Sequence, residues 1–292
     1  MHPPIFILSP PRSFTSVISA MIGQHPELYG LPEVNLFAAD TLRGLLRWFE
    51  FRPRLSHGLL RAVAELGLGA QTAENVATAK DWLNESGSLP TSDLYRDMAD
   101  WAGGRGLVDK SPLHVYEERA LSRMLDGFPD ARFIHLVRHP RSTCESVSSL
   151  QTAIREGGGR TLPRELDPDQ VWLYPHQRID GFLGQIPSAQ HRLIRGETFL
   201  AEPEANLADL CHWLGISDDR EALEEMLHPE RSPYACLGPR NAPFGTDPSF
   251  IRNPALRRFV PKPTSLDGPV AMPGNPLFSE ELIEYARALG YS

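Results

Sequence analysis

The sequence lacks long hydrophobic runs, and it is neither rich in cysteine nor basic. No apolar run approaches the roughly 18 residues that a membrane-spanning helix requires. The opening residues, MHPPIFILSPP, contain neither a basic segment nor a small-residue cleavage site, so we expect a cytoplasmic protein. A formal net charge of −8 and a pI near 5.7 argue against general binding to nucleic acid or to anionic membranes, because both require a broad basic field. An anionic ligand must therefore be met by local positive charge.

The three cysteines, Cys144, Cys211 and Cys236, are widely spaced and form no CxxC pair. This spacing supports neither a disulfide framework nor a zinc site, and we interpret all three as structural residues. No metal ligand set is expected.

Short apolar segments alternate with helical patterns along much of the chain. Continuous apolar strands of this kind predict an α/β fold with a central parallel sheet covered by helices on both faces, whose ligands bind at the carboxyl ends of the strands. The predicted strands are IFIL within 4–9, RGLVDKSP at 105–112, ARFIHLV at 131–137 and HRLIRG at 191–196. The predicted helices lie within 16–26, 117–129, 143–156, 202–215 and 279–290.

Two longer segments depart from this alternation. Residues 36–103 have the pattern of successive helices with no strand between them, so we expect a helical insert over the active site. Residues 230–276 are rich in proline and glycine and are too long for a simple connection, which predicts either a lid or acceptor loop or a partly ordered tail. We find no internal repeat and expect one domain over 1–292.

The loop SPPRSFTS at residues 9–16 follows the first strand and precedes a helix. Arg12 and the hydroxyls of Ser13, Thr15 and Ser16 are suited to hold a phosphate or sulfate at that helix N-terminus. The alternative is a capped helix start with an exposed arginine. A Walker loop, GxxxxGK followed by Ser or Thr, is absent, so hydrolysis of ATP or GTP with magnesium is not the favoured function.

Two further strand ends have basic residues. Arg138 follows the strand at 131–137, and Ser146 lies eight residues later, so the two are suited to a second phosphate. Lys110 follows the strand at 105–109 as a point charge for a phosphoryl or sulfuryl group. The alternatives are an ordinary turn with a capping serine and a solvated lysine.

The segments IFILSPPRSFTS, DKSP, FIHLVRHPRSTCESV and EPEANLADLCHWLGI occur in the order and approximate spacing of the sulfotransferases that use 3′-phosphoadenosine 5′-phosphosulfate, PAPS. The sequence resembles that family over most of its length, which implies a P-loop-like sulfotransferase fold related to the nucleotide kinases. The resemblance implies that PAPS is the donor, that 3′-phosphoadenosine 5′-phosphate (PAP) is the product and that no metal is needed. It assigns the 5′-phosphosulfate to the loop residues Arg12, Ser13, Phe14, Thr15 and Ser16, and the 3′-phosphate to Arg138 and Ser146.

The chain departs from the family pattern at two positions. Phe14 stands where the first loop commonly has glycine, and we expect it to be a helical residue whose ring points at the acceptor pocket or the lid. Gly196, in the sequence Arg195-Gly196-Glu197, stands where related enzymes often have an aromatic residue associated with the cofactor.

Sulfuryl transfer requires a base for the acceptor and positive charge near the leaving group. Resemblance to sulfotransferases with a catalytic glutamate points to Glu33 as the base, and the alternative is that Glu33 stabilises a helix start. His25 and His114 are rival bases, because histidine titrates near neutral pH. Arg12 and Lys110 are expected to neutralise charge on the leaving phosphate. His135 and His139 are interpreted as residues that serve packing or hydrogen bonding.

The acceptor is expected to be a hydroxylated small metabolite, with an amine less favoured. The tract at 230–276 resembles the C-terminal loop of sulfotransferases from polyketide and nonribosomal peptide pathways, which implies either a hydroxylated natural product or a carrier-bound acceptor. Its arginines, among them Arg240, suit a lid that closes over an anion. An aromatic cluster in the helical insert suits either an acceptor pocket or, as we favour, the core. Its members are Leu45, Trp48, Phe49, Phe51, Leu59 and Leu60.

Two other functions stay open at this point. A phosphotransferase of the nucleotide-kinase type would share the fold, and a PAP-binding protein without turnover would account for Phe14. No heptad pattern indicates an oligomeric state.

Overall fold

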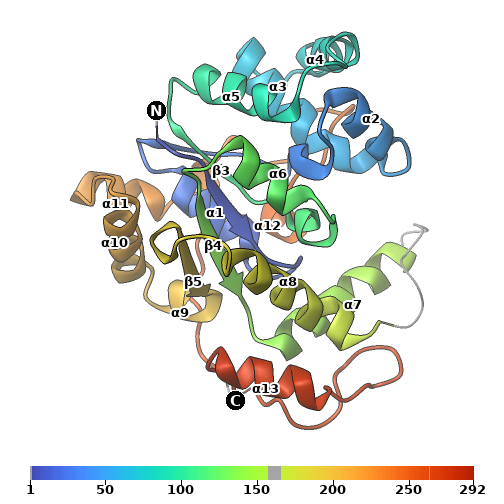
Figure 1. Ribbon diagram of the computed structural model, residues 1–292, viewed down its shortest axis with the longest axis vertical. Helices are drawn as coiled ribbons and strands as arrows, with labels where there is room; N and C mark the ends of the chain where they lie inside the picture. The colour runs from blue at the N-terminus through green and yellow to red at the C-terminus, as the bar shows by residue number, and fades with distance from the viewer. Residues whose placement is uncertain (1, 157–165, 263) are drawn as a thin grey trace.

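Five short strands form one parallel sheet in the order β2-β3-β1-β4-β5. The computed structural model describes residues 2–156, 166–262 and 264–292. Helices lie on both faces of the sheet (Figure 1), so the predicted α/β fold is confirmed. The four predicted strands are present, and β2 was not predicted, because its three residues are too few to show a pattern. The strands are β1 (Ile5–Leu8), β2 (Leu28–Gly30), β3 (Gly106–Asp109), β4 (Arg132–Val137) and β5 (His191–Arg195).

The strand β1 shows how the two layers of helices are held. All four of its side chains are buried, and successive side chains point to opposite faces of the sheet. Ile5 and Ile7 pack into a cluster with α1, α10 and α11, whereas Phe6 and Leu8 pack into a larger cluster with α3, α5 and α6. The helices are α1 (Thr15–Gly23), α2 (Leu42–Glu50), α3 (His57–Leu68), α4 (Ala73–Glu85), α5 (Thr91–Trp101), α6 (Ala120–Gly127), α7 (Pro140–Glu156), α8 (Tyr174–Leu183), α9 (Gly196–Ala201), α10 (Pro203–Leu214), α11 (Arg220–Met226), α12 (Pro248–Arg252) and α13 (Glu280–Ala288).

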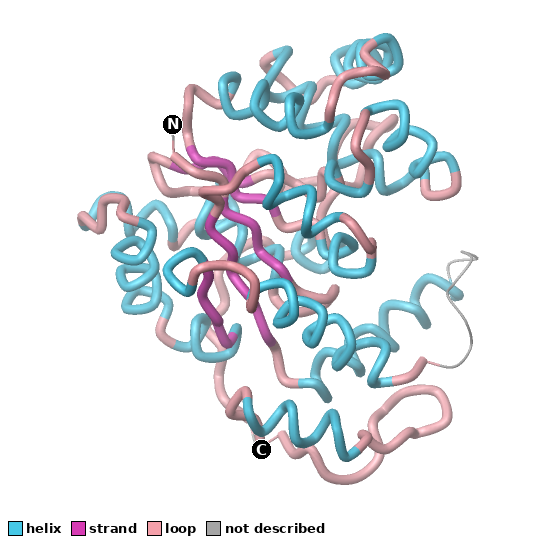
Figure 2. The backbone as a smooth tube through the Cα atoms, in the orientation of Figure 1, coloured by secondary structure: helices cyan, strands magenta, loops and turns pink. Residues whose placement is uncertain are grey.

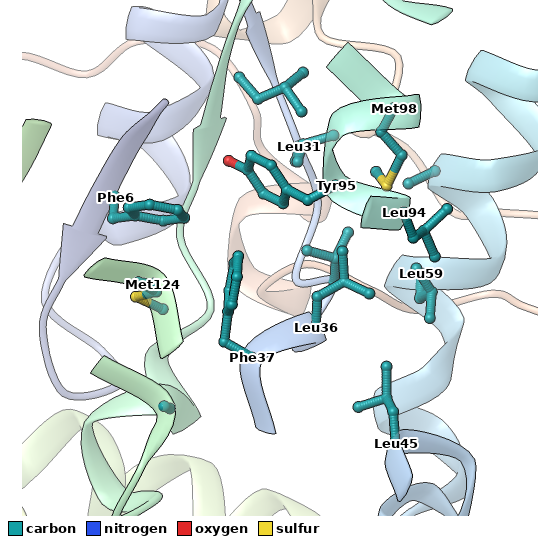
Figure 3. Close-up of a cluster of buried hydrophobic side chains, with 14 of the residues drawn as sticks. Phe6, Leu31, Leu36, Phe37, Leu45, Leu59, Leu94, Tyr95, Met98 and Met124 are labelled. Carbon is teal, nitrogen blue, oxygen red and sulfur yellow. The ribbon is translucent and has the colours of Figure 1, made fainter. Parts of the chain in front are cut away.

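The segment 36–103 folds into α2, α3, α4 and α5, as its sequence predicts. Its apolar side chains form much of the larger core cluster. Figure 3 shows Tyr95 of α5 beside Phe37, with Phe6 of the sheet nearby. The ring centroids of Phe37 lie 5.4 Å from Tyr95 and 5.3 Å from Phe6, so aromatic contacts join this segment to the sheet. Short single-turn helices complete the chain: η1 (Leu36–Ala38), η2 (Pro53–Ser56), η3 (Pro112–Tyr116), the π-helical η4 (Asp169–Leu173), η5 (Ser188–Gln190) and η6 (Pro229–Arg231).

The tract at 230–276 is mostly loop (Figure 2), and buried contacts fix its first half. Arg61 of α3 is fully buried and donates from Nη1 to the carbonyl oxygen of Phe244 at 3.1 Å. The hydroxyl oxygens of Tyr29 and Tyr234 lie 3.1 Å apart. This half of the tract is therefore docked on the helices rather than a loose tail, and its action as a lid stays a prediction.

No helix in the described part of the chain combines the length and the apolar character needed to cross a membrane.

Candidate active site

The carboxyl edge of the sheet brings charged residues from four strands to one place. Arg12 follows β1, Glu33 follows β2, Lys110 follows β3 and Arg138 follows β4. Because the strands are parallel, their carboxyl ends share one edge of the sheet. Residues that are far apart in the sequence therefore form a single site.

Lys110 is the centre of this site. Its side chain is only 2% exposed, and its Nζ donates to Ser16 Oγ at 2.8 Å and to Glu33 Oε1 at 2.7 Å. The Glu33 side chain is 25% exposed, so this carboxylate can face a ligand while it stays paired with the lysine. Lys110 is thus a buried cation, and the alternative of a solvated lysine is wrong.

The backbone at Glu33 is fixed from several sides. Its N–H donates to the carbonyl oxygen of Gly245 at 2.7 Å, and the side-chain amide of Asn35 donates to its carbonyl oxygen at 3.2 Å. A Cβ added to Gly58 would lie 2.1 Å from that same oxygen, so the close approach requires glycine. Glu33 lies before η1 rather than in a helical turn, and the alternative of a helix-start residue is therefore wrong.

Arg12 connects the first loop to α7 and to α12. Its Nε donates to Ser146 Oγ at 3.0 Å, and its Nη2 donates to Ser249 Oγ at 3.2 Å. Its Nη1 makes an ion pair with Asp247. The Arg12 side chain is 15% exposed, so the predicted guanidinium donor is present but is held by groups of the protein itself.

Asp247 places a carboxylate in the predicted anion site. Besides its ion pair with Arg12, it caps α12 by accepting from the N–H of Ser249 at 2.7 Å. Burial alone would raise the pKa of this carboxyl, but the Arg12 guanidinium holds it below the ordinary value. The order Asp-Pro at 247–248 is typical of a helix start, and nothing in the sequence indicated a partner for Arg12.

Arg138 has unused donor capacity close to the same loop. Its Nη1 donates to the carbonyl oxygen of Arg12 at 2.6 Å, whereas its Nε has no hydrogen-bond partner among the described residues. Burial lowers its pKa below the usual arginine value, and Glu197 acts in the opposite direction. Ser13 Oγ is also buried with no partner in the described structure. Two buried donors beside the loop are thus available to an anion.

The backbone conformation of Phe14 differs from the one that we expected. Its φ of 63° places it in the left-handed region, where a side chain is strained, so it is not the right-handed helical residue that we expected. The Arg138 guanidinium carbon lies 4.3 Å from the centroid of its ring, and the ring contacts Phe259 of the C-terminal tract at 6.1 Å between centroids. A Cβ added to Gly196 would lie 2.6 Å from Phe14 Cδ2. Phe14 and Gly196, the two departures from the family pattern, are therefore in contact. The Phe14 ring fills space that only glycine at position 196 leaves free.

Two cavities adjoin the site. The first, of about 340 Å³, is lined by the loop together with Arg138, Ser146 and α12. The second, of about 760 Å³, is lined by Arg195 at the end of β5, by Glu197 of α9 and by Phe259 of the C-terminal tract, among others. Because Phe14 lines the first cavity and contacts Phe259, this aromatic pair lies between the two cavities.

Two predicted site residues lie away from the site, and a third, His114, is enclosed in the protein. His25 follows α1 at the amino edge of the sheet, where its Nε2 lies 2.8 Å from the carbonyl oxygen of Ser217. His114 is 1% exposed, and burial lowers its pKa to about 3, with a backbone hydrogen bond to Asn35 acting in the opposite direction. Arg240 is exposed, and its neighbour Asn241 donates to the carbonyl oxygen of Ala73 at the start of α4 at 2.9 Å. The topology separates His25 and Arg240 from Lys110, and burial disfavours the charged form of His114.

The remaining expectations concern packing. His135 Nε2 lies 2.8 Å from His176 Nδ1, and His139 packs edge-on against Tyr291, in agreement with packing roles. Most of the aromatic cluster of the insert is core, whereas Phe51 is 87% exposed and Trp48 is partly buried. The core members are Leu45, Phe49, Leu59 and Leu60.

Sequence reasoning did not find Asn35, Asp109, Asp247 or Ser249. Asp109 is 1% exposed and accepts from Ser111 Oγ at 2.8 Å, and Ser111 Oγ accepts from the N–H of Asn35 at 3.0 Å. Burial raises the Asp109 pKa to about 7, and Ser111 and Lys110 act in the opposite direction. The left-handed φ of Asn35, 53°, suits asparagine, but only the folded chain shows which residues it orients.

A parallel sheet with cations after three of its strands, one of them the buried Lys110, is an α/β arrangement suited to an anionic ligand. The model of the sulfotransferase family matches residues 3–220, so the chain belongs to that family. Curated relatives include an omega-hydroxy-beta-dihydromenaquinone-9 sulfotransferase, Stf3, from Mycobacterium bovis and from Mycobacterium tuberculosis. Each is 28% identical over 116 residues, which are 38% of this chain and 29% of the relative, so the match spans less than a third of those relatives.

Two solved structures resemble the whole chain. One is the sulfotransferase domain from the curacin biosynthetic pathway, with a TM-score of 0.76 and 23% identity over 100% of this chain and 99% of that one. The other is the sulfotransferase domain from the Synechococcus PCC 7002 olefin synthase, with a TM-score of 0.74 and 24% identity over 100% of this chain and 97% of that one. At this identity the likeness establishes the P-loop-like sulfotransferase fold.

Proposed function

We propose that this protein transfers a sulfuryl group from PAPS to a hydroxyl group of a small metabolite or a carrier-bound acceptor, and that it releases PAP. The observation that carries the proposal is the convergence of Arg12, Lys110 and Arg138 from three strands onto one loop. Three cations at one edge suit a ligand with several anionic groups better than a single carboxylate. Family membership supports the same class of reaction.

The residues present fit such a ligand. Arg12, Ser13, Thr15 and Ser16 would hold the 5′-phosphosulfate, and Arg138 with Ser146 would hold the 3′-phosphate. The buried donors Ser13 Oγ and Arg138 Nε support this assignment, because neither has a partner within the described residues. PAPS supplies an activated sulfuryl group when it is bound. The larger cavity beside Phe259 provides additional volume for the adenosine.

Glu33 is the proposed general base. Its Oε1 accepts from Lys110, which leaves Oε2 available to accept the proton of an acceptor hydroxyl. Lys110 holds the carboxylate in place and, from the same Nζ, donates to Ser16 in the anion loop. One buried ammonium thus connects the base with the site of developing negative charge, where a cation stabilises the transition state. His114 is a weaker candidate, because burial lowers its pKa to about 3, far below the neutral range in which a histidine base works best.

Asp247 must change partners when a phosphate group binds. Its carboxylate pairs with the Arg12 Nη1 that the proposal assigns to the ligand. A multiply charged phosphate competes for that donor, and its binding would release the start of α12 from the loop. Binding of the donor is thereby coupled to the C-terminal tract, which is consistent with its predicted role as a lid.

Calorimetric titration with PAP tests the proposal, with ATP and magnesium titrated in parallel. We expect PAP to bind in the micromolar range and ATP with magnesium not to bind. Binding of ATP alone would favour a phosphotransferase. Binding of PAP with no turnover of PAPS across a panel of hydroxylated acceptors would favour a binding protein.

A further inference from the structure

Four exposed arginines lie within twelve residues, on α2 and the turn after it. They are Arg43, Arg47, Arg52 and Arg54, and Phe51 lies among them with 87% of its surface exposed. We call these five residues the arginine surface. The segment 43–54 contains one acidic residue, Glu50, so it contributes a formal charge of +3 to a chain whose net charge is −8. Such a local reversal of sign marks a surface that meets an acidic partner.

The charges of this surface have no carboxylate partners within the part of the chain that the structure describes. No arginine among the four makes an ion pair with a carboxylate of the described residues. Arg52 lies over the ring of Trp48 at 4.8 Å, and Arg54 lies over the ring of Phe244 at 5.3 Å. These stacking contacts hold two of the guanidinium groups in place and leave their charge uncompensated.

The arginine surface is also continuous with the active site. Phe244 precedes Gly245, whose carbonyl oxygen accepts from the N–H of the proposed base Glu33. The backbones of Gly245 and Gly58 are in close contact, since a Cβ on Gly245 would lie 2.6 Å from Gly58 Cα. Arg54 contacts Phe244, and the next residue, Gly245, holds the backbone of Glu33. A partner bound at Arg54 would therefore lie close to the segment that supports Glu33.

We propose that the arginine surface is a docking site for a small acidic protein that presents the acceptor to the active site. An extended polyanion or an anionic membrane would also face the rest of this acidic chain, whereas a compact protein needs only a local patch. Phe51 is the one large apolar side chain exposed on this segment, which suits a single apolar socket on the partner. Membrane insertion would require a broader apolar face. That the bound partner carries the acceptor rests on the proposed function, whereas docking of an acidic protein at the arginine surface does not.

The test uses an acidic acyl carrier protein in its holo form as the probe. Its affinity is measured by calorimetry against the wild-type chain and against the double variant Arg43→Glu/Arg47→Glu. The control variant, Arg220→Glu/Arg287→Glu, carries the same change in charge. Arg220 and Arg287 are exposed residues of α11 and α13, which lie well away from α2 (Figure 1). None of the four residues belongs to the proposed active site.

We expect the α2 variant to bind the carrier at least roughly tenfold more weakly than the wild type, because two attractive contacts become repulsive. The control variant should bind like the wild type, and raising the salt from about 50 to about 300 mM should weaken wild-type binding. A carrier loaded with a hydroxyacyl chain should show a raised KM with the α2 variant, and the same chain on free pantetheine should not.

Equal affinity of the wild type and the α2 variant would overturn the docking site, as would absence of carrier binding. The wild type could instead bind phosphatidylglycerol vesicles and not the carrier, with vesicle binding lost in the α2 variant. That result would assign the surface to a membrane and would also overturn the docking proposal. PAP titration separates the two proposals. If PAP fails to bind while the carrier docks, only the proposed function fails, and if PAP binds while the carrier does not, only the docking site fails.

Discussion

Replacement of Asp247 by asparagine should raise the affinity for PAP while it lowers the stability of the protein. The substitution keeps the shape of the side chain, and its remaining carbonyl oxygen can still cap α12 through the N–H of Ser249. It replaces Oδ2, the oxygen that pairs with Arg12, by an amide nitrogen, so the negative charge and the hydrogen bond to Arg12 are lost together. A phosphate group would then no longer compete with a carboxylate for the guanidinium.

The magnitudes follow from the burial of the pair. The side chains of Arg12 and Asp247 are 15% and 23% exposed, so their contact is partly shielded from water. A hydrogen bond between charged groups contributes about 1.5–3 kcal/mol, and solvent screening of this partly exposed pair reduces that figure. We therefore expect Asp247→Asn to lose about 1–2 kcal/mol of stability and to bind PAP roughly tenfold more tightly.

The contribution of Asp247 to the stability of the protein changes with pH in a definite direction. The pKa of Asp247 is lowered in the folded state, so its contribution to stability is complete above the ordinary carboxyl pKa and is lost as the pH falls through the lowered value. The asparagine variant should lack this loss on the acid side. The difference in stability between wild type and variant should therefore shrink as the medium is acidified.

Calorimetry with PAP and chemical denaturation measure the two effects. Asp93→Asn is a matched control, because Asp93 is exposed and pairs with Arg96 on α5. The control should leave PAP affinity unchanged. If Asp247→Asn binds PAP with the wild-type affinity or more weakly, Asp247 does not compete for the anion site and the argument is refuted.

Four further predictions concern the other parts of the site. Gly196→Ala should cost about 1–3 kcal/mol by overpacking against Phe14, and Phe14→Gly in the same chain should restore most of that loss in thermal denaturation; additive losses would contradict the contact. Glu33→Gln should lower the rate of sulfuryl transfer by about 10² to 10⁴ with PAP affinity nearly intact, and an unchanged rate would assign the base elsewhere. Arg138→Ala should weaken PAP binding by about 1.5–3 kcal/mol in calorimetry, and wild-type affinity would remove it from the site. Because burial raises the pKa of Asp109 to about 7, stability should fall as the pH rises from about 4 to 7, by up to about 4 kcal/mol; Asp109→Asn should flatten this dependence in denaturation at several pH values, and an unaltered slope would exclude Asp109 as its source.

Much of the anion site follows from the order of residues along the chain. An apolar strand followed by Arg12, another followed by Lys110 and a third followed by Arg138 predict one cationic edge, because parallel strands end together. Glu33 was placed by resemblance to a family rather than by a strand, since β2 is only three residues long. The predictions were therefore strongest where a regular strand preceded the charged residue.

The residues that the predictions missed act across long separations. Asp247 pairs with Arg12 from 235 positions away, and no local pattern reports such a contact. The expectation of a helical Phe14 was wrong for a related reason. Its ring packs on Arg138 and on Gly196, and these contacts accompany a backbone conformation that the local sequence disfavours.

The sequence by itself determined the α/β class, the parallel sheet and the family, because hydrophobic period and residue order are local properties of the chain. Only the tertiary structure decided which polar residues meet at the carboxyl edge. It paired Lys110 with Glu33, placed Asp247 on Arg12 and excluded His25 from the site. The physical reason is that ion pairs and burial depend on distances in space, and distant segments acquire those distances only when the chain folds.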